Sequence, residues 1–319
     1  MNKPILFVLT LLFSQQLLAQ QLPLFSQYRE NYIAINPAMV SPEYLLYQQN
    51  LSFGASYRTQ WKDFEGAPET QFLRGEYLHE TRGFGLLTGG YLINDQTGPT
   101  GLTGVYGRIG GILAEDPYYG GISIGLTLGA VQYRVNTSEL RLRDGNDILA
   151  GDSKTQFHPD VGVGIYYYKQ FSGGFFDNDY VYAGVSIPQA IGLDLSFQDE
   201  FGDFSITRTR HFYAQAGMFH LLDGESYLEL SAWGKFVEGA PANVNINFRY
   251  QTNSNIWVGV GGSTAGTAHI ETGLQLGENA GFDNTIRIGY SFDYTFSSFG
   301  PSVGNTHEFS IAYSLYTTN

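Results

Sequence analysis

Of the residues that most often carry out catalysis, cysteine is missing from this sequence and histidine is scarce and scattered. The chain of 319 residues contains no cysteine, which excludes a thiolate nucleophile, a thiolate metal site and a disulfide framework. Its six histidines include no pair four residues apart, so the spacing that holds zinc on one face of a helix is missing. We therefore expect no enzymatic activity and no cofactor.

One segment carries residues that could bind calcium. Within the stretch LRLRDGNDILAGD, Asp144 and Asn146 are spaced like the first two ligands of an EF-hand loop. The glycine expected at position six and the bidentate glutamate expected at position twelve are both missing. We therefore expect these charges to lie in solvent on a loop, and we expect no metal site.

A second kind of chemistry, the binding of a partner, is indicated by a repeated tetrapeptide. Glu-Gly-Ala-Pro occurs at residues 65–68 and 238–241, each time after an aromatic residue and before an alternating segment. Glycine permits a positive φ, and proline fixes its own φ and keeps the preceding residue extended, so each copy predicts a rigid turn. The two turns are either ordinary loop structure or, with two nearby aromatics, a shaped rim or a lumen constriction that contacts a partner. The candidate partner-binding or cargo-binding residues are Trp61, Phe64, Gly66, Ala67, Pro68, Gly239, Ala240 and Pro241.

The segments that must position these turns alternate with period two. Between Asn243 and Gln251, apolar Ile246 and Phe248 alternate with polar Asn247 and Arg249. Such alternation also fits a soluble sandwich. However, the segments have about the 9–11 residues that a tilted strand needs to cross a bilayer, and their polar faces carry charges that suit a wet lumen better than a dry core. We therefore expect an all-β transmembrane barrel with antiparallel strands.

The number of strands agrees with a bacterial barrel, because these have an even number of strands. We expect about 14, near residues 51–60, 70–79, 83–94, 100–114, 118–135, 157–168, 179–187, 206–221, 226–238, 242–251, 256–263, 269–276, 284–294 and 306–316. If the mature N-terminus is periplasmic, the odd-numbered connections face outward. The two longest, 136–156 and 188–205, are odd, and so are both Glu-Gly-Ala-Pro turns.

The beginning of the sequence predicts export. Residues 1–19 combine Lys3 with an apolar run too short to span a bilayer, which is typical of a signal peptide. Residues 20–50 lack alternation but contain five aromatics, so we expect an ordered periplasmic or lumen-associated segment. Residues 51–319 form the predicted barrel. A net charge of −13 argues against a nucleic-acid partner.

An ordered set of motifs resembles the PorP/SprF family of outer-membrane proteins, which belongs to the type IX secretion system of the Bacteroidetes. The similarity runs over nearly the whole mature chain. It rests on Phe25-Ser-Gln-Tyr28, Asn36-Pro-Ala38, Gln60-Trp61, Gly66-Ala-Pro68, Asn94-Asp95, Gly98-Pro-Thr100, Gln132-Tyr-Arg134, Pro159-Asp160, Tyr166-Tyr-Tyr168, Lys235 to Pro241, Arg287-Ile-Gly-Tyr290 and His307-Glu308.

This resemblance implies an outer-membrane accessory of type IX secretion. Its implied partners are a secreted cargo protein, such as a gliding adhesin with a type B C-terminal sorting domain, and periplasmic ring or peptidoglycan-associated components. The alternative is a general porin or small-solute channel of the outer membrane. A porin should have an open lumen, whereas Trp233, Trp257 and Tyr182 on the predicted inner face favour a filled one.

Overall fold

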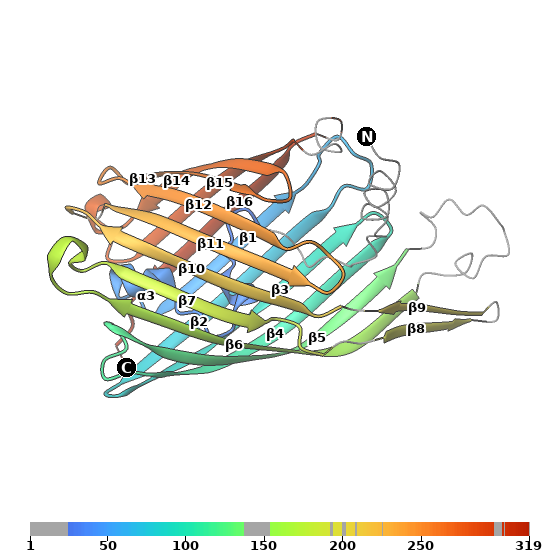
Figure 1. The fold of residues 1–319 in the computed structure, drawn as a ribbon, viewed down its shortest axis with the longest axis horizontal. Coiled ribbons are helices and arrows are strands. Elements are labelled where there is room, and N and C mark those ends of the chain that lie inside the picture. Colours follow the sequence, from blue (N-terminus) through green and yellow to red (C-terminus); the bar gives the residue numbers. More distant parts are fainter. Residues whose placement is uncertain are drawn as a thin grey trace, which may run out of the picture.

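The computed structural model describes residues 25–136, 154–191, 194–199, 202–207, 209–224, 226–296, 302 and 304–318. Fourteen antiparallel strands close into one barrel, in which β1 pairs with both β2 and β16 (Figure 1). The barrel strands are β1 (Leu51–Thr59), β2 (Glu69–Thr81), β3 (Phe84–Thr97), β4 (Thr100–Leu113), β5 (Gly120–Val135), β6 (Lys154–Gln170), β7 (Tyr180–Ile187), β10 (His211–Leu221), β11 (Tyr227–Val237), β12 (Asn243–Gln251), β13 (Ile256–Ser263), β14 (Thr267–Leu276), β15 (Thr285–Thr295) and β16 (Thr306–Leu315). The predicted barrel and its number of strands are confirmed.

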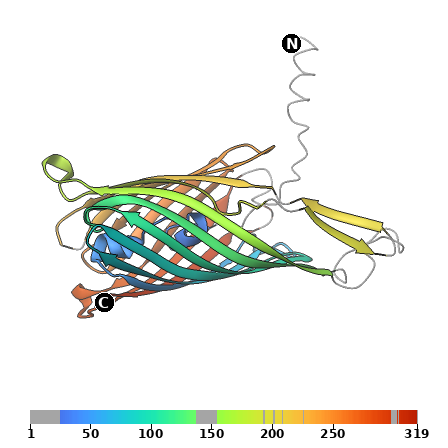
Figure 2. The ribbon, with the colours of Figure 1, turned by 90° about the horizontal axis from the view of Figure 1, so that it is seen from below.

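Two further strands lie outside the barrel. β8 (Asp194–Asp199) and β9 (Gly202–Thr207) pair with each other as a hairpin that projects from one end of the barrel (Figure 2). The predicted loop over residues 188–205 and the predicted start of the next strand at residue 206 are therefore wrong. The barrel strand begins at His211, because residues 202–207 are already paired in the hairpin.

Burial along the strands follows the predicted alternation. On β12, Asn247, Arg249 and Gln251 are buried toward the lumen, whereas Ile246 and Phe248 are exposed on the outer surface. The same outer surface carries exposed Leu, Ile, Val and Phe side chains on most strands, as a lipid-facing belt requires. Among the described residues, no helix is long and apolar enough to cross a membrane.

The connections divide the barrel into two ends. We call one the loop end, with connections 60–68, 98–99, 136–153, 188–210, 238–242, 264–266 and 296–305. We call the other the turn end, with connections 82–83, 114–119, 171–179, 222–226, 252–255 and 277–284. The first strand begins and the last strand ends at the turn end, and both Glu-Gly-Ala-Pro turns lie at the loop end.

Candidate functional site

Residues 25–50, which we call the plug, lie inside the barrel. They contain two short helices, α2 (Tyr32–Ile35) and α3 (Pro42–Tyr47), drawn in blue within the ring of strands in Figure 2. Ser41 caps α3 by accepting a 3.1 Å hydrogen bond from the Glu43 N–H, and Pro42 occupies the first helical turn, where its missing N–H costs nothing. Nearly every plug residue is buried, so the lumen is occupied by the chain itself.

The plug runs along the barrel from the loop end to the turn end. At the loop end, the Ser26 N–H donates a 2.7 Å hydrogen bond to Glu308, which is near the start of β16. At the turn end, the Asn50 side chain exchanges hydrogen bonds of 3.0 and 2.8 Å with the backbone of Thr317. The described chain therefore begins near the loop end, so the premise of a periplasmic N-terminus no longer supports the predicted orientation. The lengths of the connections remain the argument for it.

Buried ion pairs join the plug to β12 and β15 of the barrel wall. Glu30 Oε1 lies 3.2 Å from Arg249 Nη1 and 3.4 Å from Arg287 Nη1, and Arg287 Nη1 also lies 3.2 Å from Glu43. Burial by itself raises the pKa of the Glu30 carboxyl, but the guanidinium groups of Arg287 and Arg249 outweigh burial and lower this pKa to about 2. Glu30 is therefore charged at neutral pH, and its charge is neutralised from two different strands.

Arginines of the wall also bind the backbone of the plug. Arg74 Nε donates a 2.7 Å hydrogen bond to the Glu30 carbonyl, and Arg108 Nε donates a 2.6 Å hydrogen bond to the Pro37 carbonyl. In the reverse direction, Arg29 of the plug pairs with Glu229 of β11 at 2.9 Å. Arg74 is on β2, Arg108 is on β4 and Glu229 is on β11. The plug is therefore bonded to strands at several places around the lumen.

The Asn36-Pro37-Ala38 turn fits against a patch of glycines. Asn36 Nδ2 donates a 3.1 Å hydrogen bond to the Ile165 carbonyl of β6, and its Oδ1 accepts a 2.9 Å hydrogen bond from the Ala38 N–H. A Cβ added at Gly164 would collide with Asn36 Oδ1, and one added at Gly125 would collide with the Pro37 carbonyl. Glycine is required because the plug backbone approaches the wall this closely.

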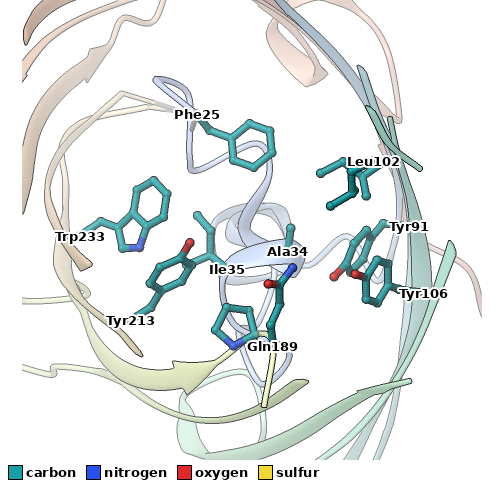
Figure 3. A pocket seen from close by; sticks show the side chains of 11 residues that line it. Phe25, Ala34, Ile35, Tyr91, Leu102, Tyr106, Gln189, Tyr213 and Trp233 are labelled. Carbon is teal, nitrogen blue, oxygen red and sulfur yellow. The ribbon is translucent and has the colours of Figure 1, made fainter. Parts of the chain in front are cut away.

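A small cavity of about 40 Å³ remains between the plug and the wall. In Figure 3, Ile35 of the plug lies beside Tyr213 of the wall, the Phe25 ring points to the side where Leu102 lies, and Gln189 of the connection after β7 also lines the cavity. One water molecule needs roughly 10–15 Å³ in such a cavity. The cavity can therefore hold a few waters and is not a passage for solutes.

The turn end has a wider hollow of about 970 Å³. It is bounded by the β2–β3 turn, the β4–β5 connection and the end of β6. Its lining includes Glu80, Glu115, Asp116, Tyr118 and Lys169.

The first predicted site forms an ordered loop between β1 and β2. The Gln60 N–H bonds to the Pro68 carbonyl at 2.9 Å, which closes the base of the loop. Trp61 and Gly66 both have positive φ, of 57° and 74°, and such a φ is uncommon for a bulky residue such as tryptophan. Phe64 is 49% exposed.

This loop is hydrogen-bonded to two neighbouring connections at the loop end. The Lys62 N–H bonds to the Asn305 carbonyl at 3.1 Å, and the Gly98 N–H bonds to the Gly66 carbonyl at 2.9 Å. Hydrogen bonds therefore hold the loop between the β3–β4 turn and the connection before β16.

The second predicted site is a more open turn between β11 and β12. Gly239 has φ 81° with nothing within 4 Å of the position a Cβ would take, and Pro241 is exposed. The Ala240 N–H bonds to the Val237 carbonyl at 3.2 Å. Strands β13 to β16 lie between the two sites in the barrel, so the structure places them at one end but not side by side.

Trp233, Trp257 and Tyr182 are buried on the inner face of the wall, as predicted. The structure also adds residues that the sequence did not indicate. Sequence alternation placed Arg249 and Glu229 on the inner face, but it gave no sign of Glu30 and Arg29 as their partners. The signal that could have indicated these partners is the presence of charged residues, such as Arg29 and Glu30, in the plug, a segment rich in aromatic residues.

Catalytic and metal-binding arrangements are not apparent among the described residues. Residues 121–125 have the spacing G-x-S-x-G, but they lie within β5 and Ser123 is fully buried, whereas a nucleophile elbow exposes its serine at a strand-to-helix turn. In the part of the chain that the structure describes, no three His, Asp or Glu residues are grouped to hold a metal ion. The calcium candidates Asp144 and Asn146 lie outside the described residues.

Comparisons with known proteins agree with this architecture. The family model described as "Type IX secretion system membrane protein PorP/SprF" matches residues 17–313. No curated protein matches the chain.

Similar solved structures are outer-membrane barrels. A TodX ΔS2S3 mutant, a monoaromatic hydrocarbon channel, superimposes with a TM-score of 0.57 at 10% identity, covering 88% of this chain and 93% of that one. The toluene transporter TodX of P. putida gives 0.52 at 9% identity, with 91% and 94% covered. A FadL homologue of Pseudomonas aeruginosa gives 0.51 at 9% identity, with 89% and 93% covered. At these identities the likeness shows a shared fold.

Proposed function

Because the chain belongs to the PorP/SprF family of type IX secretion system membrane proteins, we propose that it is a non-enzymatic accessory that binds, delivers or anchors surface cargo. Its location is the outer membrane, as the family and the barrel both indicate. The proposed cargo is a secreted surface protein, such as an adhesin with a type B C-terminal sorting domain.

The observation that carries this proposal is the filled lumen. A porin needs a continuous water-filled passage, whereas here residues 25–50 occupy the lumen and are bonded to the wall near both ends. Removing the plug would take from Arg249, Arg287 and Glu229 the ion pairs that they form with Glu30, Glu43 and Arg29, which is costly for buried charges. A barrel built in this way is better suited to present a surface than to conduct solutes.

The loop end is the proposed cargo-binding end, facing the cell exterior. It carries the β8–β9 hairpin and the longest connections, and long extracellular loops are where barrels place recognition. The proposed contact residues are those of the two Glu-Gly-Ala-Pro turns, with Trp61 and Phe64 as aromatic anchors. The ordered backbone of the first loop supports this role, because a pre-organised loop loses little entropy on binding.

The turn end is the proposed contact for periplasmic components of the system. Its hollow of about 970 Å³ combines acidic and tyrosine side chains on short connections. A periplasmic ring or peptidoglycan-associated subunit would meet this end first if the loop end faces outward.

The alternative function is a small-solute channel. The solved channels with the same fold favour it, but their likeness at 9–10% identity concerns the fold alone. The discriminating measurement is steady conductance of the purified protein in planar bilayers, which a channel shows and a plugged barrel does not.

The proposed function is tested by comparing the surface and secreted proteomes of a strain lacking the gene with those of its parent. We expect loss of one or a few large surface proteins. Loss of every type IX cargo would instead indicate a core part of the machine, and an unchanged proteome would refute a role in secretion.

A further inference from the structure

The barrel wall is uneven beside β6. β5 and β6 are paired from Gly120↔Lys169 to Val135↔Lys154, whereas β6 and β7 are paired only from Gln170↔Tyr180 to Val163↔Ile187. Residues 154–162 of β6 therefore extend past β7 toward the loop end, where the green strands reach beyond the neighbouring wall in Figure 2. Among the described residues, no strand pairs with this part of β6 on the side away from β5.

The part of this edge nearest to β7 is hydrogen-bonded to the segment that follows β7. After β7, the Ala190 N–H donates a 2.6 Å hydrogen bond to the Val161 carbonyl, and the Asp160 carboxylate accepts a 2.9 Å hydrogen bond from the Val161 N–H. Asp160 is fully buried and also accepts a 2.7 Å hydrogen bond from the Tyr106 hydroxyl. Both backbone groups of Val161 are thus satisfied.

Beyond Val161, no strand of the described residues pairs with this edge, and we call residues 155–159 the open edge. The backbone groups of successive strand residues point alternately to the two sides, so Thr155, Phe157 and Pro159 point to the same side as Val161. Within the described part of the chain, the N–H and carbonyl groups of Thr155 and Phe157 and the carbonyl of Pro159 have no strand to bond with on that side.

Pro159 fits this position and would not fit a central one. Proline cannot donate to a ladder and is confined in sheets to edges and bulges. Here its missing N–H falls on the open side, so the β5–β6 ladder loses nothing. The Pro159-Asp160 motif thus has a physical role: the proline marks where pairing stops, and the aspartate fixes the strand below it.

The chemistry of the open edge specifies its occupant. A row of unpaired N–H and C=O groups is complemented by another extended backbone. Phe157, on the outer face of the edge, is 70% exposed and offers an apolar contact to a side chain of such a strand. The occupant must therefore be an extended peptide with an apolar residue beside Phe157.

A second copy of this chain does not fit the edge. Two barrels in one membrane have the same end up, so their β6 strands run in the same vertical sense. Because barrel strands tilt by about 35–45°, two facing β6 strands would cross at roughly twice that angle and could not form a ladder.

We propose that the open edge of β6 at residues 155–159 accepts a β-strand of the secreted cargo protein, which extends the barrel wall beyond β7. This inference rests on the proposed function, because it identifies where the cargo binds. It predicts that main-chain hydrogen bonds, rather than side chains alone, hold the cargo at the loop end.

The test places the photo-crosslinking residue p-benzoylphenylalanine at position 157 in living cells. The control position is Ile246 on β12, which is also apolar and exposed on the outer surface. We expect the surface protein that is lost from the deletion strain to be crosslinked from position 157 and not from position 246. Crosslinks to a second copy, to the chain's own hairpin, or to no protein would overturn the proposal.

A second measurement tests the backbone directly. Thr155→Pro removes an N–H from the open edge, whereas Thr155→Ala keeps it. Since one hydrogen bond is worth about 0.5–1.5 kcal/mol, we expect Thr155→Pro to reduce retained cargo roughly two- to tenfold and Thr155→Ala to leave it unchanged. Equal retention in the two variants would count against strand pairing. The deletion proteome is read separately, so a failure of the edge can be distinguished from a failure of the cargo role.

Discussion

Glu30 Oε1 lies 3.2 Å from Arg249 Nη1, although 219 positions separate the two residues in the sequence. This pair joins the plug to β12 in the buried lumen, and Arg287 adds a second cation to the same carboxylate. Arg249 also pairs with Glu271 at 2.8 Å, and Arg287 also pairs with Glu43 at 3.2 Å. Removing Glu30 therefore leaves a buried cluster with more positive than negative charge, which is destabilising.

Glu30→Ala should release the plug. It removes the carboxylate that Arg249 and Arg287 share, while Glu271 still pairs with Arg249 and Glu43 with Arg287. The cost is therefore at most the about 3–5 kcal/mol of leaving a buried charge without any partner. We expect steady conductance in planar bilayers from the variant and none from the wild type. Glu65→Gln, at an exposed loop position, is the matched control and should stay closed. A closed Glu30→Ala barrel would show that the ion pairs do not hold the plug.

Acid should weaken the plug in a defined range of pH. The pKa of Glu30 falls from its ordinary value of 4.5 to about 2 in the folded protein. A depressed pKa means that the stabilisation is complete above about pH 4.5 and is lost as the pH falls toward 2. Conductance measured against pH should rise within this range. In Glu30→Gln, which has no charge to lose, the contribution of this group to the rise should disappear.

Gly164→Ala should displace the Asn36-Pro37-Ala38 turn. The added methyl group collides with Asn36 Oδ1, and overpacking of this kind costs typically about 1–3 kcal/mol. We expect a lower thermal unfolding temperature, measured as the temperature at which heating the sample before electrophoresis removes the compact, fast-migrating band. Gly107→Ala is the control, since its methyl group would meet only the Leu128 carbonyl, at 3.9 Å. Equal unfolding temperatures would mean that the plug is not tightly seated there.

The double substitution Trp61→Ala and Phe64→Ala should abolish cargo retention while the barrel assembles normally. The two aromatics are the proposed anchors of the ordered loop after β1, and aromatic anchors commonly dominate binding energy. Surface cargo is measured on whole cells by antibody or by mass spectrometry. Phe282→Ala, also exposed but at the turn end, serves as control. Normal retention in the double variant would end the proposal for this loop.

Period two predicted which side of the wall each residue faces, but not what it meets there. Arg249 lies on the polar face of its strand and was correctly placed in the lumen, because alternation sets the face. Its partner Glu30 could not be inferred, since the plug has no periodicity and its path is set by contacts distant in sequence. The β8–β9 hairpin was missed for another reason: its six-residue strands are too short to cross a bilayer, so they did not count as barrel strands.

The path of the plug also sets an order of events during biogenesis. The barrel closes between β1 and β16, the first and last strands of the chain, so the ring is complete only after the whole polypeptide has reached the membrane. Ser26 bonds to Glu308 on β16 and to Asp293 on β15, which are among the last residues to arrive. The bonds of Ser26 therefore need both β15 and β16, so the plug reaches its final position only when the last two strands of the barrel are in place. Seating of the plug and closure of the barrel are thus coupled through the same two strands.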